Sequence, residues 1–537
     1  MKYAWTLLLM VAAALAGLYL GWVSGNNAAS GGYGENQRGP LTLGGGKLDE
    51  VLELVENFYV DPIDMDSLQE LAIPQVMKQL DPHSVYIPRS DVERVSGELK
   101  SDFGGIGVTF SIREDTVCVM SVVAGGPSSA LGVLPGDKII KVNGKDFAGK
   151  AAGLTNQKVL DNLRGEIGSK VSISVFRHPS TTLDFDIVRG EIPLISVVST
   201  YEIAPGVGYM RIDRFAEKTY EEMIAGIGKL KAEGCDKLIV DLRSNAGGFL
   251  NVVQAMCNEF LGRGEMIVYT EGGHQRRQES CADGTGTCRD IGLTVLIDEF
   301  SASASEIFAG AMQDNDRGTI IGRRSFGKGL VQTELTLADQ SHLRLTVSRY
   351  HTPSGRCIQR PYDHGDEEYY QDINERYKGG ELFSADSIKA DTAQVFHTRK
   401  GRTVYGGGGI VPDIFVPFDT ASASHYLYTL RSKRLIYDYA MTYVDGHRDQ
   451  LKRLTAPDLI HQLQKTPFID GITAYAAKHG VARPAKLEEK ESLIIANEVR
   501  AYVGQAIKDN DGFYPILNTM DPVIDKALEA LNAKSLY

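Results

Sequence analysis

The sequence predicts an α/β fold preceded by a β-rich domain, with helical regions at both ends. In residues 191–418, short apolar runs alternate with segments of helical periodicity, which is typical of βαβ units. Residues 101–190 instead hold short strands separated by glycine-rich turns. Residues 47–100 and 419–537 are mostly helical in pattern. These patterns predict a helical N-terminal region, a β domain, an α/β core and a helical C-terminal region.

The composition is that of an ordinary globular protein. The 537 residues suffice for three or four domains, and 43% are hydrophobic and 23% charged. The chain has 57 basic and 69 acidic residues, which gives a net charge of −12. A negative chain has no general attraction for nucleic acid, so we expect no nucleic-acid partner.

The first 30 residues predict a signal peptide or a membrane anchor. Ala4–Val23 is nearly all apolar and is close to the length of about 20 residues that spans a bilayer. Cleavage near Ala28-Ala29 and an uncleaved anchor both remain open. Residues 31–46 are rich in glycine and predict a flexible spacer. We therefore expect an exported protein, either periplasmic or membrane-anchored and facing the extracytoplasmic side.

Within the core, a group of serines stands where a strand is expected to end and a helix to begin. Leu293–Ile297 is a short apolar run, and Ile307, Phe308, Ala311 and Met312 recur at helical spacing. The unpaired N–H groups at a helix N-terminus can hold an oxyanion, which suits a nucleophilic serine there. The alternative is structural, because Ser303-Ala304-Ser305-Glu306 is also a capping box.

Further along, a lysine stands in a glycine-rich turn between two expected strands. Gly318–Gly322 and Val331–Leu335 flank the turn, and Lys328 has a glycine on each side. Burial can lower the pKa of a lysine until its amine serves as a base, and Gln332 stands close enough to orient it. An exposed lysine in a turn is the alternative. A phosphate-binding loop is disfavoured because Gly329 replaces the required Ser or Thr and a strand follows where a helix is needed.

Several motifs together resemble the carboxy-terminal processing (tail-specific) serine peptidases. They are SASASEI, AGAMQD, GTIIG and FGKGLVQ in residues 301–332, and LDPHSVYIP, TPSGRCIQRPY and GGGGIVPD elsewhere in the chain. The resemblance covers residues 48–417. It implies a crotonase-like core with Ser303 as nucleophile, Lys328 as general base and Gln332 as the residue that positions the lysine.

The same resemblance implies where the oxyanion is bound. One donor is the Ala304 N–H, and the other is a glycine in Asp241–Gly248, either Gly247 or Gly248. This glycine turn follows the expected strand Lys237–Leu242, at the end of the sheet where α/β folds commonly bind ligands. His83 lacks an indicated aspartate partner, so a structural turn role is favoured over a histidine-based mechanism.

Residues 101–190 resemble a PDZ domain. The strands expected there are Ile106–Ser111, Val117–Val122, Lys138–Val142 and Val171–Phe176. A PDZ domain adds a peptide strand to its sheet and binds the terminal carboxylate with loop N–H groups. The candidate loop is Gly105, Ile106, Gly107 and Val108, so we expect protein substrates with apolar C-termini. A β domain without a peptide role is the alternative.

The six cysteines predict one disulfide and a set of core thiols. Cys281 and Cys288 share a polar loop of an exported chain, so we expect a disulfide between them, with a metal pair as the alternative. Cys118, Cys235 and Cys257 lie in apolar patterns that predict burial. We expect neither a metal nor another cofactor.

The best interpretation is an exported serine endopeptidase. The alternative is a non-catalytic PDZ scaffold or substrate adaptor built on a peptidase fold, since a fold does not prove activity. No G-x-S-x-G elbow or H-E-x-x-H helix occurs, which disfavours other hydrolase classes. The C-terminal region carries no recognisable chemistry, and packing on the core, oligomerisation and shaping access to the site are all open for it.

Overall fold

The computed structural model describes residues 46–96, 102–177, 181–363, 365–389, 393–419 and 424–532. The predicted targeting segment and all of the predicted spacer except Gly46 lie outside these residues. Within them, no helix combines the length and the apolarity that crossing a bilayer requires. The domain boundaries proposed from the sequence stay predictions.

The chain divides into two compact units, residues 1–72 and 73–537. In the first unit the described elements are helix α2 (Lys47–Phe58) and the start of helix α3 (Met65–Met77). Helix α2 has no buried residue, although Leu48, Val51 and Leu54 recur on it at helical spacing. The expected helical pattern is therefore confirmed in this stretch.

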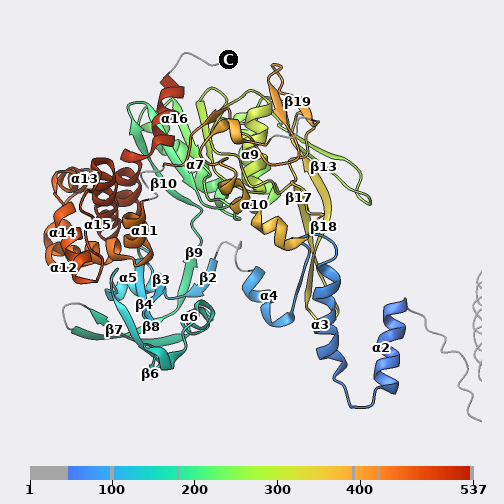
Figure 1. Cartoon of the computed structure of the whole chain (residues 1–537), viewed down its shortest axis with the longest axis horizontal. Coiled ribbons are helices and arrows are strands. Elements are labelled where there is room, and N and C mark those ends of the chain that lie inside the picture. Colours follow the sequence, from blue (N-terminus) through green and yellow to red (C-terminus); the bar gives the residue numbers. More distant parts are fainter. Residues whose placement is uncertain are drawn as a thin grey trace, which may run out of the picture. The chain divides into compact units, whose positions relative to one another are not determined.

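The core of the second unit is a six-stranded sheet that confirms the expected βαβ pattern (Figure 1). Its first strand pair is antiparallel and the remaining pairs are parallel. In spatial order the strands are β10 (Val197–Ala204), β11 (Val207–Ile212), β12 (Lys237–Asp241), β15 (Gly292–Ile297), β16 (Thr319–Gly322) and β21 (Ile414–Phe415). Parallel strands end at a common edge, so the loops after β12, β15 and β16 meet there.

Helices cover both faces of this sheet. Successive residues of a strand point to opposite faces. Leu238 and Val240 of β12 accordingly belong to the apolar cluster that includes the connecting helices α7 (Thr219–Ala232), α8 (Leu250–Phe260) and α9 (Ala304–Asp314). Ile239 belongs to the opposite cluster, which the C-terminal helix α16 (Pro522–Asn532) completes. The last helix of the chain is therefore part of the core's packing.

A second sheet takes its strands from separate parts of the chain, and only part of it was predicted from the sequence. Its strands are β1 (Val85–Ile87), β13 (Met266–Glu271), β14 (Gln278–Cys281), β17 (Leu330–Thr336) and β18 (His342–His351). Strand β1 pairs with β18, so the N-terminal region is not helical throughout, although it also contains helix α4 (Arg89–Ser96). Strand β17 begins two residues after Lys328, which places that lysine where the chain enters this sheet. Helix α10 (Asp366–Lys378) and the hairpin β19 (Val395–His397) and β20 (Thr403–Tyr405) follow.

The predicted PDZ region forms its own sheet. The strand order is β3 (Val108–Arg113), β4 (Thr116–Val122), β5 (Lys138–Val142), β7 (Lys170–Arg177) and β8 (Thr181–Val188), with β6 (Lys145–Asp146) paired to β5. The expected strand Ile106–Ser111 starts two residues late, because the chain turns at Gly107, where φ is 76°. Before the turn, β2 (Asp102–Gly105) pairs instead with β9 (Gly190–Pro193). The helices are α5 (Pro127–Leu131) and α6 (Asn156–Leu163).

The C-terminal region is a cluster of helices around its own apolar core (Figure 1). They are α11 (His425–Ser432), α12 (Leu435–Leu451), α13 (Ala456–Lys465), α14 (Ile469–Lys478) and α15 (Glu489–Leu517). The expected run Leu427–Tyr443 is split into two helices by Arg434, whose φ is 55°. Tyr437 of α12 donates to the carbonyl of Val119 in the PDZ region at 3.2 Å, so the helices contact that region as well.

Candidate active site

Of the three clustered serines, only Ser303 is left accessible. Ser301 and Ser305 are fully buried, and their hydroxyls donate to the carbonyls of Leu242 and Asn245, each at 2.8 Å. Ser303 is half-buried, and among the described residues its hydroxyl has no capping hydrogen bond. Its φ of 55° and ψ of −114° are unusual for a serine. A strained residue with a free hydroxyl at the start of α9 fits a nucleophile better than a helix cap.

The acid of the predicted capping box, Glu306, makes contacts well beyond the start of α9. Glu306 is fully buried, and its Oε2 accepts the Ser303 N–H at 2.9 Å and the Lys328 N–H at 2.8 Å. Its Oε1 accepts the Ser325 hydroxyl at 2.5 Å and the Gly327 N–H at 2.7 Å. Burial raises the pKa of Glu306 to about 7, although these hydrogen bonds favour its ionised form.

Glu306 was not predicted as a site residue. Its only sequence signal was the last position of the capping box, which shows a contact with Ser303 but not the contact with the lysine loop. A second link between the two segments is Tyr350 of β18, whose hydroxyl lies 2.7 Å from the Lys328 carbonyl and 3.1 Å from the Ser303 carbonyl. Two buried side chains thus tie the serine and lysine segments together.

Lys328 is partly buried and faces Gln332, as the spacing indicated. Its Nζ donates to Gln332 Oε1 at 3.3 Å. Burial lowers the pKa of Lys328, and the charge of Arg344 lowers it further. Among the described residues no hydrogen bond joins Lys328 Nζ to Ser303 Oγ. Gly327, with φ of 90°, allows the tight bend that brings the lysine segment against Glu306.

The amide of Gln332 is held in turn by the segment that contains His83. Gln332 Nε2 donates to the His83 carbonyl, and the His83 ring lies 2.9 Å from the Tyr369 hydroxyl. Asp81 accepts the His83 N–H at 2.9 Å, which agrees with the predicted turn. Burial and the charge of Lys328 lower the pKa of His83 to about 4. The turn therefore fixes which end of the Gln332 amide faces the lysine.

The glycine loop after β12 lies against the serine segment. A Cβ on Gly247 would stand 2.8 Å from Ser303 Cβ and 2.9 Å from Ala304 N. The Gly247 N–H already donates to Asn245 Oδ1 at 2.8 Å. Among the described residues, no hydrogen bond occupies the N–H of Gly248 or of Ala304. Of the two glycines that the sequence left open, Gly248 thus has the free donor.

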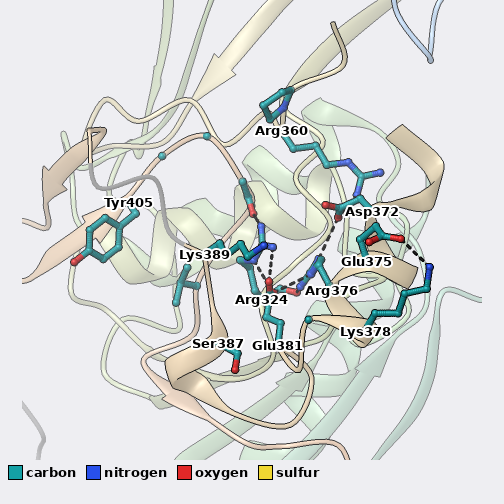
Figure 2. A pocket seen from close by; sticks show the side chains of 17 residues that line it. Arg324, Arg360, Asp372, Glu375, Arg376, Lys378, Glu381, Ser387, Lys389 and Tyr405 are labelled. Atoms are coloured by element: carbon teal, nitrogen blue, oxygen red, sulfur yellow. Dashed lines mark hydrogen bonds and ion pairs between the residues drawn. The ribbon is translucent and has the colours of Figure 1, made fainter. Parts of the chain in front are cut away.

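A cavity of about 620 Å³ adjoins the lysine loop, but its lining does not include Ser303, Lys328 or Gln332 (Figure 2). Buried ion pairs form much of its wall. Arg324 and Arg376 both bind Glu381, with nearest distances of 2.7 Å and 2.8 Å. Arg376 also donates to the carbonyl of Ser325 at 3.0 Å. Because these pairs hold the chain just before Lys328, we assign the wall of this cavity to support of the lysine loop.

The predicted peptide-binding loop lies at the start of the edge strand of the PDZ sheet. Gly105 ends β2, Val108 begins β3, and Ile106 and Gly107 form the turn between them. The carbonyls of Ile106 and Gly107 accept hydrogen bonds at 3.0 Å and 2.9 Å. Ile106 belongs to the same apolar cluster as Val159 of α6.

The predicted disulfide is not formed in this structure, where Cys281 and Cys288 are both free thiols. Cys281 is exposed on β14, opposite Met266, whereas Cys288 is buried in the core cluster. The two side chains therefore lie in different environments despite their short separation in sequence. The expected burial of Cys118, Cys235 and Cys257 is confirmed.

Comparisons with known proteins match three regions of the chain to family models. Residues 206–365 match peptidase family S41, residues 104–187 match the PDZ domain, and residues 426–509 match a family of unknown function, DUF8443. A carboxy-terminal-processing protease of Bartonella bacilliformis is 36% identical over 347 residues, which are 64% of this chain and 78% of that protein. The carboxy-terminal processing protease CtpB of Bacillus subtilis is 33% identical, covering 58% of this chain and 65% of the relative.

Among solved structures, the photosystem II D1 C-terminal processing protease matches with 25% identity and a TM-score of 0.35. The match covers 68% of this chain and 92% of that one. The family assignment rests on the sequence matches and on the order of the domains. The chain therefore belongs to the carboxy-terminal processing proteases of peptidase family S41, and it is a serine-type peptidase that carries a PDZ domain.

Proposed function

We propose that this peptidase works through a Ser303–Lys328 dyad, with Gln332 positioning the lysine. The observation that carries the proposal is the hydrogen bond of 3.3 Å between Lys328 Nζ and Gln332 Oε1. Burial lowers the pKa of Lys328, so a neutral amine becomes available nearer to neutral pH than in an exposed lysine. The free hydroxyl of Ser303 and the occupied hydroxyls of Ser301 and Ser305 support the choice of nucleophile.

The reaction would proceed in two halves. The neutral Lys328 amine takes the proton of Ser303 as Oγ attacks the scissile carbonyl carbon. The resulting ammonium gives that proton to the leaving amine when the C–N bond breaks, and an acyl-enzyme remains. Water then attacks the ester carbonyl while Lys328 accepts its proton. Lys328 gives that proton to Ser303 Oγ as the C–O bond breaks, which releases the new carboxyl terminus and restores the hydroxyl and the neutral amine.

The oxyanion of each tetrahedral intermediate would be held by the N–H groups of Ala304 and Gly248. Both belong to segments in contact with Ser303, and both lack another hydrogen-bond partner among the described residues. Gly247 instead shapes the loop, since its own N–H is bound by Asn245. Fixed donors of this kind stabilise charge that develops only in the transition state.

We propose that the PDZ domain captures the C-terminal tail of the substrate. Among the described strands, β3 pairs with β4 alone, so its other edge is available to a peptide strand. The turn Ile106–Gly107 stands at the start of that edge, next to an apolar cluster that includes Val159. A substrate tail that ends in an apolar residue fits this site, because the turn can hold the terminal carboxylate and the apolar cluster can hold the side chain. No hydrogen bond joins Lys328 Nζ to Ser303 Oγ among the described residues. We therefore propose that binding of the substrate tail brings the two groups together.

Export is proposed from the N-terminal sequence. Ala4–Val23 is long and apolar enough for a signal peptide or an anchor, and a glycine-rich spacer follows. Fractionation of cells expressing the full chain, with added external protease, tests this proposal. Recovery of the protein in the cytoplasmic fraction, protected from the protease, would exclude export.

The catalytic proposal is tested by casein cleavage with the chain lacking residues 1–30. Ser303→Ala and Lys328→Ala are each expected to lose at least ~10³-fold in activity while remaining folded. Lys433→Ala, which changes an exposed lysine, is the control and should retain full activity. Cleavage by Ser303→Ala at the parental rate would overturn the assignment. Peptides with apolar C-termini should stimulate cleavage by the parent, and should not do so once residues 101–190 are deleted.

A further inference from the structure

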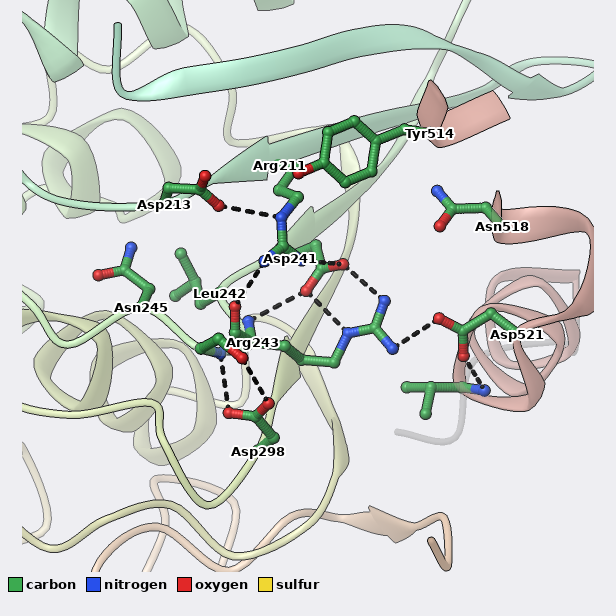
Figure 3. A network of polar contacts seen from close by, with 12 residues as sticks. Arg211, Asp213, Asp241, Leu242, Arg243, Asn245, Asp298, Tyr514, Asn518 and Asp521 are labelled. Carbon is green, nitrogen blue, oxygen red and sulfur yellow. Dashed lines mark hydrogen bonds and ion pairs between the residues drawn. The ribbon is translucent and has the colours of Figure 1, made fainter. Parts of the chain in front are cut away.

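A carboxylate of the C-terminal region, that of Asp521, reaches the loop that carries Gly248. Asp521 stands between the turn Asn518–Met520 and helix α16, and its Oδ2 accepts Arg243 Nη1 at 2.6 Å (Figure 3). Its Oδ1 accepts the Val523 N–H at 2.9 Å, so the same side chain also caps α16. This ion pair joins residues that are far apart in sequence.

Arg243 is the first charged residue of the loop that follows β12. Its Nε and Nη2 bind the two oxygens of Asp241 at 2.9 Å and 2.6 Å, and Asp521 takes the remaining side of the guanidinium. Asp241 is fully buried and also accepts Arg211 Nη1 at 3.2 Å. Asp241 therefore receives two arginines, and Arg243 is shared between Asp241 and Asp521. Removing the Asp521 charge leaves Arg243 with one partner in a largely desolvated position, which is costly.

The loop beyond Arg243 is short and is held at several points, among them Asn245, whose Nδ2 donates to the Ile212 carbonyl at 2.8 Å and whose carbonyl accepts the Ser305 hydroxyl. Ser244 donates its N–H to Asp298 Oδ1 at 2.8 Å and has a φ of 60°. After Asn245 and Ala246, Gly247 lies against the serine segment and Gly248 lies against Phe215. Arg243 and Asp298 are two of the side chains that hold this loop (Figure 3). Gly248 follows Arg243 in this same short loop, so the Arg243 contacts bear on the backbone that carries the Gly248 N–H.

We propose that Asp521 is a positioning residue for the peptidase reaction. Through Arg243 it sets the position of the loop that carries the Gly248 N–H, so the C-terminal helical region completes the oxyanion site. The inference rests on the proposed role of Gly248. Because an oxyanion donor acts in the transition state, loss of this support should lower kcat and leave KM nearly unchanged.

The docking of α16 does not depend on this carboxylate. Val523, Ile524 and Ala527 are buried against the core sheet and hold the helix by apolar packing. Asparagine is also a good N-cap, so Asp521→Asn keeps the cap at Val523 and removes the charge and the acceptor that face Arg243. This separates the positioning role from the structural one.

The test compares Asp521→Asn with Asp521→Glu and Asp525→Asn. Asp525 is an exposed acid one turn further along α16 and serves as the matched control. Asp521→Asn should lower kcat for a fluorogenic peptide ~10- to 100-fold with KM within ~2-fold, because small misplacements of a reacting group have effects of this size. Asp521→Glu should recover part of the loss, and Asp525→Asn should match the parent.

A parental kcat in folded Asp521→Asn would overturn the inference, and so would an equal loss in Asp525→Asn. If Asp521→Asn does not fold, Asp521→Ser replaces it, because serine also caps a helix. A parental kcat in Asp521→Ser would likewise overturn the inference. Ser303→Ala is assayed alongside. If Ser303→Ala cleaves like the parent, the proposed dyad fails; if Ser303→Ala is inactive and Asp521→Asn is parental, only the present inference fails.

Discussion

Glu306 Oε2 accepts the backbone N–H of Lys328 at 2.8 Å, and the same oxygen accepts the Ser303 N–H at 2.9 Å. One buried carboxylate thus sets the spacing between the segment of the candidate nucleophile and that of the candidate base. The Tyr350 hydroxyl lies near the carbonyls of the same two residues. The relative position of serine and lysine therefore depends on side chains that do not themselves contact the reacting atoms.

Glu306→Gln should strongly reduce activity. Each carboxylate oxygen accepts two donors, so either orientation of a glutamine amide turns its NH₂ group toward two of them. Unsatisfied buried groups cost about 1–3 kcal/mol each, so the loop should shift to relieve them. We expect kcat to fall by on the order of 10²-fold, measured with a fluorogenic peptide. A parental kcat in a folded Glu306→Gln variant would show that the bridge has no role in positioning.

The pH dependence of stability should report Glu306 directly. Burial raises its pKa in the folded chain to about 7, above the ordinary value of 4.5. Between these values the folded state binds more protons than the unfolded state, so this group makes the free energy of unfolding fall as pH rises through that window. Urea unfolding should show that the free energy of unfolding falls more between pH 5 and pH 8 in the parent than in Glu306→Gln. Equal falls in both proteins would mean that Glu306 keeps an ordinary pKa.

The rate of cleavage should rise with pH as Lys328 loses its proton. The base must be neutral, and burial together with the charge of Arg344 lowers the pKa of Lys328 below the ordinary 10.5. The midpoint of the rise in kcat/KM should accordingly lie below 10.5. Arg344→Gln should move the midpoint upward, because it removes a positive charge that disfavours the ammonium. A midpoint that moves down in this variant would contradict the assignment of the base.

Alanine at the paired glycines should damage both folding and activity. A Cβ on Gly248 would lie 2.1 Å from the Phe215 carbonyl oxygen, and one on Gly247 would lie 2.8 Å from Ser303 Cβ. Their φ angles of 152° and 101° disfavour alanine as well, so we expect each change to cost more than about 1 kcal/mol of stability. Gly228→Ala in α7 meets nothing within 4 Å and should instead raise the Tm.

The two cysteines that were expected to be paired should react differently with thiol reagents. Cys281 is exposed and should be modified quickly in the native protein, whereas Cys288 is buried and should be modified only after unfolding. Alkylation followed by mass spectrometry of peptides distinguishes them. Recovery of a peptide linked through Cys281 and Cys288 from the non-reduced native protein would contradict the structure.

Much of the core could be predicted because its strands and helices have strong local patterns. Strands β12, β15 and β16 each differ from their predicted ranges by one residue at one end. Strands β13, β14 and β18 were missed because they are stabilised by partners distant in sequence. The edge segment Gly105–Val108 was found, but its division between two sheets depends on β9 and could not be foreseen.

The sequence by itself determined which residue types are available for the chemistry: a serine at a helix start, a lysine between glycines, and a glutamine four positions later. Local patterns carry that information because they depend on neighbours along the chain. Only the tertiary structure decided which serine hydroxyl is free, that Glu306 joins the two segments, and that Gly248 has the unoccupied N–H. It also decided that Asp521 reaches Arg243. Those facts arise from contacts between distant segments, which packing of the whole chain creates and no local pattern encodes.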